Sequence, residues 1–182
     1  NASHFHHLQV WFHVEDENIV VDIPPGSKWM KFNVGQFGYY RVNYPIEDWK
    51  TISEQLMTNH DVFTSPSDRT HLLNDAFSLA EAERVPYTVP LDLTKYLRKE
   101  TSDGPWVGVI AKFRYLQQVF YYSGDIFANL LKYQKQLISE QYETLGWEDT
   151  GDHSTKMHRI TILSVACKSG LSECSKIASD RF

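Results

Sequence analysis

The hydrophobic period of this 182-residue sequence changes at Pro45, and that change limits the possible folds more than any other feature. Before Pro45, apolar and polar residues alternate, as they do from Leu8 to Val14, and this alternation is typical of half-buried strands. After Pro45, apolar residues recur every three to four positions, as they do along amphipathic helices. The sequence therefore predicts a mainly α fold in which a short β region precedes the helices.

The region before Pro45 is predicted to contain four short strands. They cover residues 8–14, 19–23, 29–32 and 39–44. Gly35 and Gly38 lie between the last two, where a hairpin connection requires φ > 0. Four strands are too few for a β-sandwich that stands alone. We therefore expect residues 1–44 to be the end of a β-sandwich domain with its junction, and residues 45–182 to be the first part of an incomplete helical domain.

Seven helices are predicted after Pro45. The clearest start is Ser65-Pro66-Ser67-Asp68, because serine caps helices, proline suits the first helical position and aspartate favours the positive helix end. Short connections predict antiparallel hairpins stacked in a row as an α-superhelix, although no strict repeat is present. The apolar residues expected to face inward are, in helix order, Ile46, Trp49, Ile52 and Leu56; Leu72, Leu73, Ala76, Phe77 and Ala80; Leu91, Leu93, Tyr96 and Leu97; Trp106, Val109, Ile110, Phe113, Leu116, Val119 and Phe120; Ile126, Leu130, Leu131, Leu137, Ile138 and Leu145; Met157, Ile160, Leu163 and Ala166 or Cys167; and Cys174, Ile177 and Ala178.

Charge and hydropathy argue against several classes of protein. The formal net charge is −5, whereas proteins that bind nucleic acids or anionic membranes present a basic face. The longest apolar runs are far shorter than the ~20 residues of a membrane span, and no signal peptide opens the chain. Because the chain starts with asparagine and stops inside a predicted helix, we expect it to be a piece of a longer protein.

The polar residues do not form a catalytic or metal-binding motif. His4, His6 and His7 are the closest histidines, while His153 and His158 are five positions apart and so lie on different faces of a predicted helix. The sequence contains no His-Glu-x-x-His, Gly-x-Ser-x-Gly or P-loop motif. We therefore predict that no residue of this chain is catalytic or binds a metal. The acidic clusters, predicted to be solvated, are Glu15-Asp16-Glu17, Glu81 with Glu83, and Asp149 with Asp152.

Cys167 and Cys174 are the only two cysteines, and they flank a predicted turn between two helices. A helical hairpin could bring their Cα atoms within disulfide range, but two buried thiols would fit the same spacing. The spacing alone leaves both alternatives open. At the start of the chain, Asn1-Ala2-Ser3 is a weak candidate for N-glycosylation.

Several segments resemble a known family. Trp29-x-Lys31-x-Asn33 followed by Gly38-Tyr39-Tyr40-Arg41-Val42-Asn43-Tyr44 resembles the junction between the β-sandwich and the helical domain of gluzincin-type zinc aminopeptidases. The segment from Leu145 to His153 is similar to the glutamyl aminopeptidase subgroup of that family. Further similar segments are Ser67-Asp68-Arg69, Leu72 to Ala80, and Leu91 to Leu97.

The resemblance implies that the chain is a non-catalytic part of a zinc exopeptidase that removes N-terminal, possibly acidic, residues from peptides. In such enzymes zinc is bound by two histidines and a glutamate of an upstream catalytic domain, and no position of residues 1–182 matches them. The helical domain would close over the active site and limit the access of substrates. The implied partners are peptide substrates, the upstream catalytic domain and a second copy of the longer protein, but no nucleic acid. The implied location is outside the cell, either membrane-anchored or secreted.

The resemblance also assigns roles to individual residues. It implies a disulfide between Cys167 and Cys174, as in extracellular members of the family. It implies that the junction residues pack the sandwich against the first helices; these are Trp29, Gly38, Tyr39, Tyr40, Arg41 and Tyr44. Arg69, Lys95 and Arg159 either line the substrate cavity or form ordinary ion pairs. The alternative to this whole interpretation is a free-standing helical module that binds other proteins and has no enzymatic activity.

Overall fold

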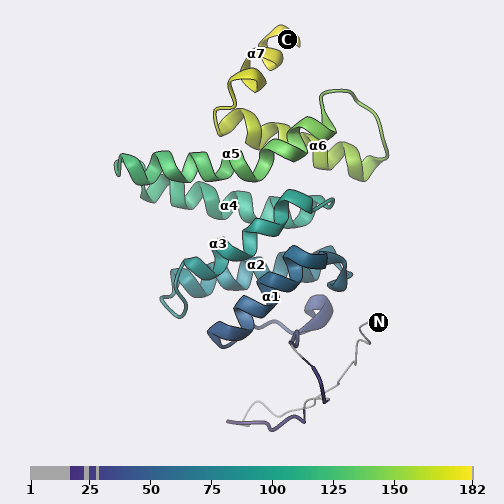
Figure 1. Cartoon of the computed structure of the whole chain (residues 1–182), viewed down its shortest axis with the longest axis vertical. Helices are drawn as coiled ribbons and strands as arrows, with labels where there is room; N and C mark the ends of the chain where they lie inside the picture. The colour runs from purple at the N-terminus through teal and green to yellow at the C-terminus, as the bar shows by residue number, and fades with distance from the viewer. Residues whose placement is uncertain (1–16, 23–24, 28, 182) are drawn as a thin grey trace. The chain divides into compact units, whose positions relative to one another are not determined.

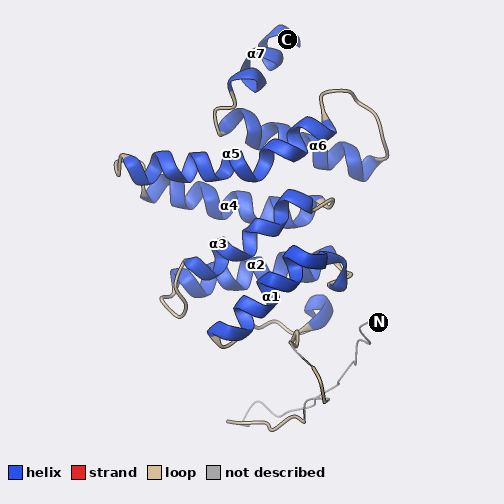
Figure 2. Ribbon diagram, in the orientation of Figure 1, coloured by secondary structure: helices blue, strands red, loops and turns tan. Residues whose placement is uncertain are grey.

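The computed structural model describes residues 17–22, 25–27 and 29–181. The chain divides into two units, residues 1–31 and residues 32–182, and each is described by itself. The second unit is helical, and the described residues contain no strand, which confirms the prediction of a mainly α fold (Figures 1 and 2). Its elements are η1 (Val34–Gln36), α1 (Ile46–Asn59), η2 (His60–Val62), α2 (Pro66–Glu81), α3 (Thr88–Thr94), η3 (Lys95–Lys99), α4 (Asp103–Val119), α5 (Asp125–Leu145), α6 (His153–Lys168) and α7 (Ser172–Arg181), where η marks a 3₁₀ helix.

The strands predicted before Pro45 do not form in the described residues. In place of a hairpin, Asn33 adopts a left-handed conformation, and its side chain holds the following turn by bonding both N–H and C=O of Gly38 at 2.8 Å. Residues 41–45 have no regular secondary structure, and the N–H of Val42 donates to the Asp75 carboxylate of α2 at 2.9 Å. The Asp75 side chain thus accepts the backbone hydrogen bond that a neighbouring strand would accept in a sheet. The predicted run 8–14 lies outside the described residues, and a preceding β-sandwich stays a prediction.

Large apolar side chains fill the space between α1, α2, η3 and α4. The faces predicted for α1 and α2 are buried as expected, apart from Ile46, which is half exposed. Helix α4 comes close to α2 because it carries glycines where they meet. A Cβ atom at Gly108 would lie 3.2 Å from Cγ2 of Thr70, and one at Gly104 would lie 3.3 Å from its Oγ1. These glycines explain why α2 and α4 pack as the most extensive pair in the stack.

The inward face predicted for α6 was wrong at Met157 and Ile160, although Ala166 is buried as expected. Met157 and Ile160 are 41% and 61% exposed, whereas Ile162, Val165 and Ala166 are buried together with His158 and Arg159. Helix α6 carries apolar residues on two faces, so its hydrophobic period does not select one of them. The polar pair can be buried because α5 supplies partners for it, which local sequence does not reveal.

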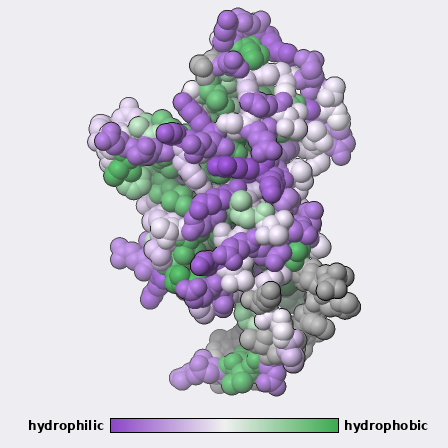
Figure 3. Space-filling model, viewed as in Figure 1, coloured by the Kyte–Doolittle hydropathy of each residue, from purple (hydrophilic) through white to green (hydrophobic). Residues whose placement is uncertain are grey.

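The ends of α4 and α5 that adjoin their connecting turn also differ from the prediction. Val119 and Ile126 were expected to face inward, but both are 54% exposed. Figure 1 shows this end of the hairpin extending to the left of the helices that cover its middle, and Figure 3 shows apolar side chains gathered there. Helical period predicts a common face along the whole helix, but the neighbouring elements bury only part of it.

Candidate functional site

A buried ion pair joins α2 to the residue that follows η3. The guanidinium of Arg69 donates to Glu100 twice, from Nε to Oε2 at 2.6 Å and from Nη2 to Oε1 at 2.7 Å. The two side chains are 4% and 0% exposed, and the Nη1 of Arg69 also donates to the Phe63 carbonyl at 2.7 Å. Burial would raise the pKa of Glu100, but the hydrogen bonds from Arg69, the hydrogen bond from the N–H of Ser102 and the positive charge of Arg69 together outweigh it and lower that pKa. The carboxylate therefore stays charged inside the protein.

Gln141 on α5 extends this pair towards α6. Its Nε2 donates to three carbonyl groups at and just after the end of η3, those of Leu97, Arg98 and Glu100. Its Oε1 lies 2.6 Å from Nε2 of His158 on α6. Four buried polar residues, Arg69, Glu100, Gln141 and His158, thus form a polar chain from α2 to α6, in which Glu100 binds Arg69 through its side chain and Gln141 through its backbone carbonyl. Because each member has a specific partner, the chain can fix how these helices pack against one another.

The junction residues lie against the first two helices of the second unit. The Tyr44 hydroxyl accepts the N–H of Phe32 at 3.0 Å, its ring meets Trp49 edge-on at 4.9 Å, and burial is the main reason why its pKa rises to about 12. Arg41 pairs with Asp75 on α2, with an N–O distance of 3.2 Å.

The other predicted junction residues are more exposed. The ring of Tyr40 lies over Gly38 so closely that a Cβ atom there would be 2.1 Å from it, which excludes any other residue at Gly38 without rearrangement. Tyr39 is fully exposed and Tyr40 is 48% exposed. Trp29 belongs to the first unit and is partly buried.

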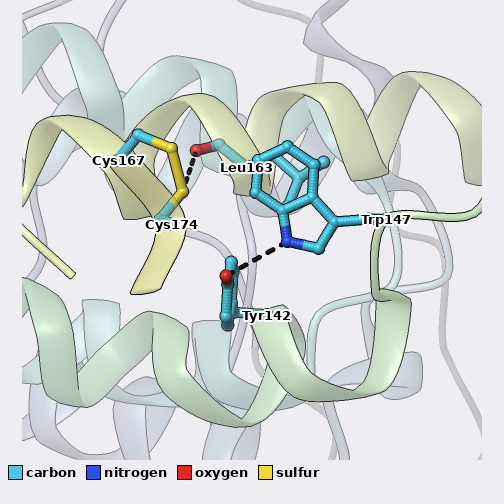
Figure 4. The surroundings of a disulfide bond; sticks show 5 residues. All are labelled: Tyr142, Trp147, Leu163, Cys167 and Cys174. Carbon is cyan, nitrogen blue, oxygen red and sulfur yellow. Dashed lines mark hydrogen bonds between the residues drawn. A yellow bond between two sulfur atoms is a disulfide. The ribbon is translucent and has the colours of Figure 1, made fainter. Parts of the chain in front are cut away.

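A disulfide joins Cys167 and Cys174, the pairing that the resemblance implied, and spans the turn between α6 and α7 (Figure 4). The turn is also closed by its backbone, because Gly170 has a φ of 78° and Leu171 donates to the carbonyl of Ala166. Cys174 is fully buried, and its Sγ lies 3.5 Å from the carbonyl oxygen of Leu163.

Trp147, in the loop between α5 and α6, lies beside the disulfide (Figure 4). Its Nε1 donates to the Tyr142 hydroxyl at 3.1 Å. Arg181 of α7 stacks on the indole ring of Trp147, with its guanidinium carbon 5.8 Å from the ring centroid, and it donates a hydrogen bond to the Trp147 carbonyl. The α5–α6 loop and α7 therefore stabilise each other.

Apolar side chains are exposed in several places within the second unit, and two of these places are candidate binding surfaces. The first includes Val34, Phe37, Tyr39 and Tyr40, all of which precede α1. The second is a shallow hollow of about 400 Å³ at the turn between α4 and α5. Its lining residues are Arg114, Gln117, Gln118, Tyr121, Tyr122 and Phe127. Neither place brings together a nucleophile, a base and an acid.

The cationic residues considered for a substrate cavity all have partners within the domain. Arg69 is bound by Glu100, Lys95 pairs with Asp92 one turn earlier, and Arg159 donates to the carbonyl of Leu145 at 3.0 Å. The ordinary-ion-pair alternative fits Arg69 and Lys95, and Arg159 is held by a backbone carbonyl.

No metal site is present among the residues that the structure describes, which contain no group of three or more His, Cys, Asp or Glu side chains arranged around a common point. In the same part of the chain no helix is long and apolar enough to cross a membrane. Asn1, His4, His6 and His7 lie outside the described residues.

Sequence reasoning missed the polar chain and the role of Asp75. One signal was available for Gln141, because this residue occupies the same helical stripe as Leu137 and Ile138, where an apolar residue is expected. His158 and Glu100 gave no such signal, because their partners are distant in sequence.

Comparison with known proteins places these features in a family. The family described as the ERAP1-like C-terminal domain matches residues 29–182. Human glutamyl aminopeptidase is 38% identical over 159 residues, which cover 87% of this chain and 16% of that protein. Rat glutamyl aminopeptidase is 35% identical over 96% of this chain and 18% of its own length. Rabbit aminopeptidase N is 31% identical over 92% of this chain and 18% of its own length. The chain thus spans less than a fifth of the length of these relatives.

Proposed function

Because the chain belongs to the family of ERAP1-like C-terminal domains, we propose that it is the helical part of a longer zinc aminopeptidase that removes N-terminal residues from peptides. The match over residues 29–182 carries this proposal, together with the names of the relatives, which are aminopeptidases. Glutamyl aminopeptidases are 35–38% identical over most of the chain, so acidic N-terminal residues are the preference to test first.

The chemistry in this proposal belongs to another part of the longer protein. The described residues offer no set of ligands that would fit a zinc ion. Zinc, when bound elsewhere in the enzyme, would activate the water that attacks the peptide bond.

The role proposed for this domain is to cover the active site and to limit which peptides reach it. Two observations support this role. The polar chain and the apolar core give a stack whose helices hold a fixed packing, as a cover requires. The exposed residues Val34, Phe37 and Tyr39 precede α1 and offer an apolar surface for the upstream part of the enzyme. In this proposal the peptide substrate and the catalytic domain are the partners, with a homodimer of the longer protein as a further one.

The disulfide supports a location outside the cell. Disulfides persist in oxidising compartments and are rare in the cytosol. We therefore include in the proposal that the longer enzyme is secreted or exposed on the outer side of the plasma membrane, and labelling of intact cells with an impermeant reagent tests this.

The experiment that tests the proposal compares the full-length protein with the isolated 182-residue chain. We expect the full-length protein to hydrolyse glutamyl nitroanilide faster than alanyl nitroanilide, to lose activity in a zinc chelator and to regain it with zinc. The isolated chain should be inactive. Chelator-resistant activity of the full-length protein, or turnover by the isolated chain, would contradict the proposal.

A second measurement tests the covering role. In the full-length enzyme, Glu100→Ala should loosen the domain and raise the hydrolysis of long peptides relative to the nitroanilide. Lys112→Ala removes a more exposed partner of Glu81 and is the control that should leave this ratio unchanged. An unchanged ratio in the Glu100 variant would contradict control of access by this domain. If the full-length protein has no peptidase activity at all, the alternative of a helical protein-binding module is favoured.

A further inference from the structure

We propose that protonation of the His158 ring loosens the packing of α6 and α7 on the helical stack, while α1 to α4 stay ordered. This inference concerns the domain itself and does not depend on the proposed peptidase activity. It rests on the hydrogen bonds of Gln141, on the burial of the His158 ring and on the way α6 and α7 are attached.

The hydrogen bonds of Gln141 determine which nitrogen of His158 carries the proton. Its amide group points Nε2 at three carbonyl oxygens, which can only accept. The opposite end, Oε1, is therefore an acceptor, and it lies 2.6 Å from Nε2 of His158. Nε2 must donate this bond, so the neutral ring carries its proton on Nε2 and has a bare lone pair on Nδ1.

Burial of the His158 ring outweighs the groups that favour a second proton, which are the carboxylates of Asp103 and Glu100 and the backbone of Glu100. His158 is 3% exposed, and its Nδ1 has no hydrogen-bond partner. Two carboxylates act on it, Asp103 of α4 and Glu100 after η3, but Glu100 is already neutralised by Arg69 of α2. From α5 the facing group is the amide of Gln141, which does not titrate, and on α6 itself the neighbouring Arg159 is a cation.

The direction of the pH effect follows from this environment. Burial lowers the pKa of His158, and the attraction of Asp103 and Glu100 opposes it without cancelling it. The folded protein therefore binds fewer protons than the unfolded chain below the ordinary histidine pKa of about 6.5. The packing of α6 is at full strength above this value and weakens as the pH falls from there through the lowered pKa.

The effect is expected to be local because α6 buries few apolar side chains, and none of them is aromatic. Its buried apolar residues are Ile162, Val165 and Ala166, whereas α1 to α4 share a core of large aromatic side chains. Helix α7 is joined to α6 by the disulfide, so it should move with α6. Protonation of one side chain can then open this end of the stack without unfolding the rest.

Hydrogen exchange of the full-length protein at about pH 7.5 and about pH 5.5 tests the proposal, after correction for intrinsic exchange rates. We expect the amides of α6 and α7 to lose at least several-fold protection at the lower pH, while those of α1 and α2 change little. His158→Gln keeps an N–H that can donate to Gln141 but cannot titrate, so it should abolish the selective loss. His153→Gln removes an exposed histidine of the same helix and should behave as the unaltered protein. A selective loss that persists in His158→Gln overturns the proposal.

A second measurement on the unaltered protein covers the case in which His158→Gln does not fold. The ring resonances of His158 should titrate below the ordinary histidine value, and the Gln141 side-chain amide should shift with the same midpoint. A His158 ring that titrates at or above about 6.5, or a Gln141 amide that does not follow it, overturns the proposal.

Discussion

The helices up to α4 and the helices from α5 onwards are held together by different means. In the first group many of the buried side chains are large and apolar, among them Trp49, Phe77 and Trp106, and they surround a buried ion pair between Arg69 and Glu100. In the second group the buried apolar residues are fewer and smaller, and they share the interior with Gln134, Gln141, His158 and Arg159. The second group also contains the disulfide.

One helical stack can thus combine two sources of stability, apolar packing and polar or covalent links between helices. Apolar volume tolerates changes of pH and salt but not the loss of a large side chain. Polar partners and cross-links respond to the protonation or oxidation state of a few groups. The part after α4 buries less apolar volume and contains the disulfide, so its packing is expected to depend more on pH and oxidation state than the packing of the first group does.

The largest effect is expected from removing a large side chain in the first group. Trp106→Ala should destabilise the protein by about 3–5 kcal/mol, because it leaves a cavity where α4 meets its neighbours. Urea unfolding followed by circular dichroism measures this change. The control is Val107→Ala. Val107 directly follows Trp106 but is 51% exposed, so this change should cost about 0.5 kcal/mol or less. Equal losses in the two variants would remove the basis of the comparison.

The buried ion pair within the first group comes next. Glu100→Ala should cost about 3–5 kcal/mol, because it leaves Arg69 charged and buried. The double variant Arg69→Met, Glu100→Leu should recover most of this loss in the same unfolding assay. Since folding lowers the pKa of Glu100, its stabilisation is lost as the pH falls through the lowered value, and the double variant should lack this acid dependence. A double variant as unstable as Glu100→Ala would show that the pair stabilises rather than merely avoids a buried charge.

A smaller and more local effect is expected at the disulfide. Replacing Cys167 and Cys174 by alanine should cost about 2 kcal/mol, because the loop that they close is short. Hydrogen exchange should show the loss in α7 but not in α1. Arg181→Ala is the matched control on α7, and its exposed ion pair with Glu148 should contribute about 1 kcal/mol or less. Equal loss of protection in α1 and α7 would contradict a local role of the disulfide.

The smallest effect is a gain of stability in the first group. Glu83 follows α2 with a φ of 57°, a conformation that glycine adopts without strain. Glu83→Gly should therefore stabilise the protein by up to about 1 kcal/mol, measured as a higher urea midpoint. Glu83→Ala keeps the Cβ atom and is the control, which should give no gain. If alanine stabilised as much as glycine, backbone strain would not be the reason.

The same difference decides how much of the structure could be predicted from the sequence. The inward faces of α1 and α2 were predicted because each has one apolar stripe, and large residues occupy it. The face of α6 could not be predicted, because His158 and Arg159 are buried only by virtue of partners on α5. The predicted strand at 39–44 failed for a related reason, since the partner of Val42 is Asp75, a side chain 33 positions away.

Hydrogen exchange of the full-length protein in increasing, sub-denaturing urea tests most directly whether the two groups of helices are held differently. The account predicts that the amides of α6 and α7 open in a separate step at lower urea, while those of α1, α2 and α4 exchange only with global unfolding. A single opening free energy shared by all these helices would contradict it, because the stack would then be one cooperative unit.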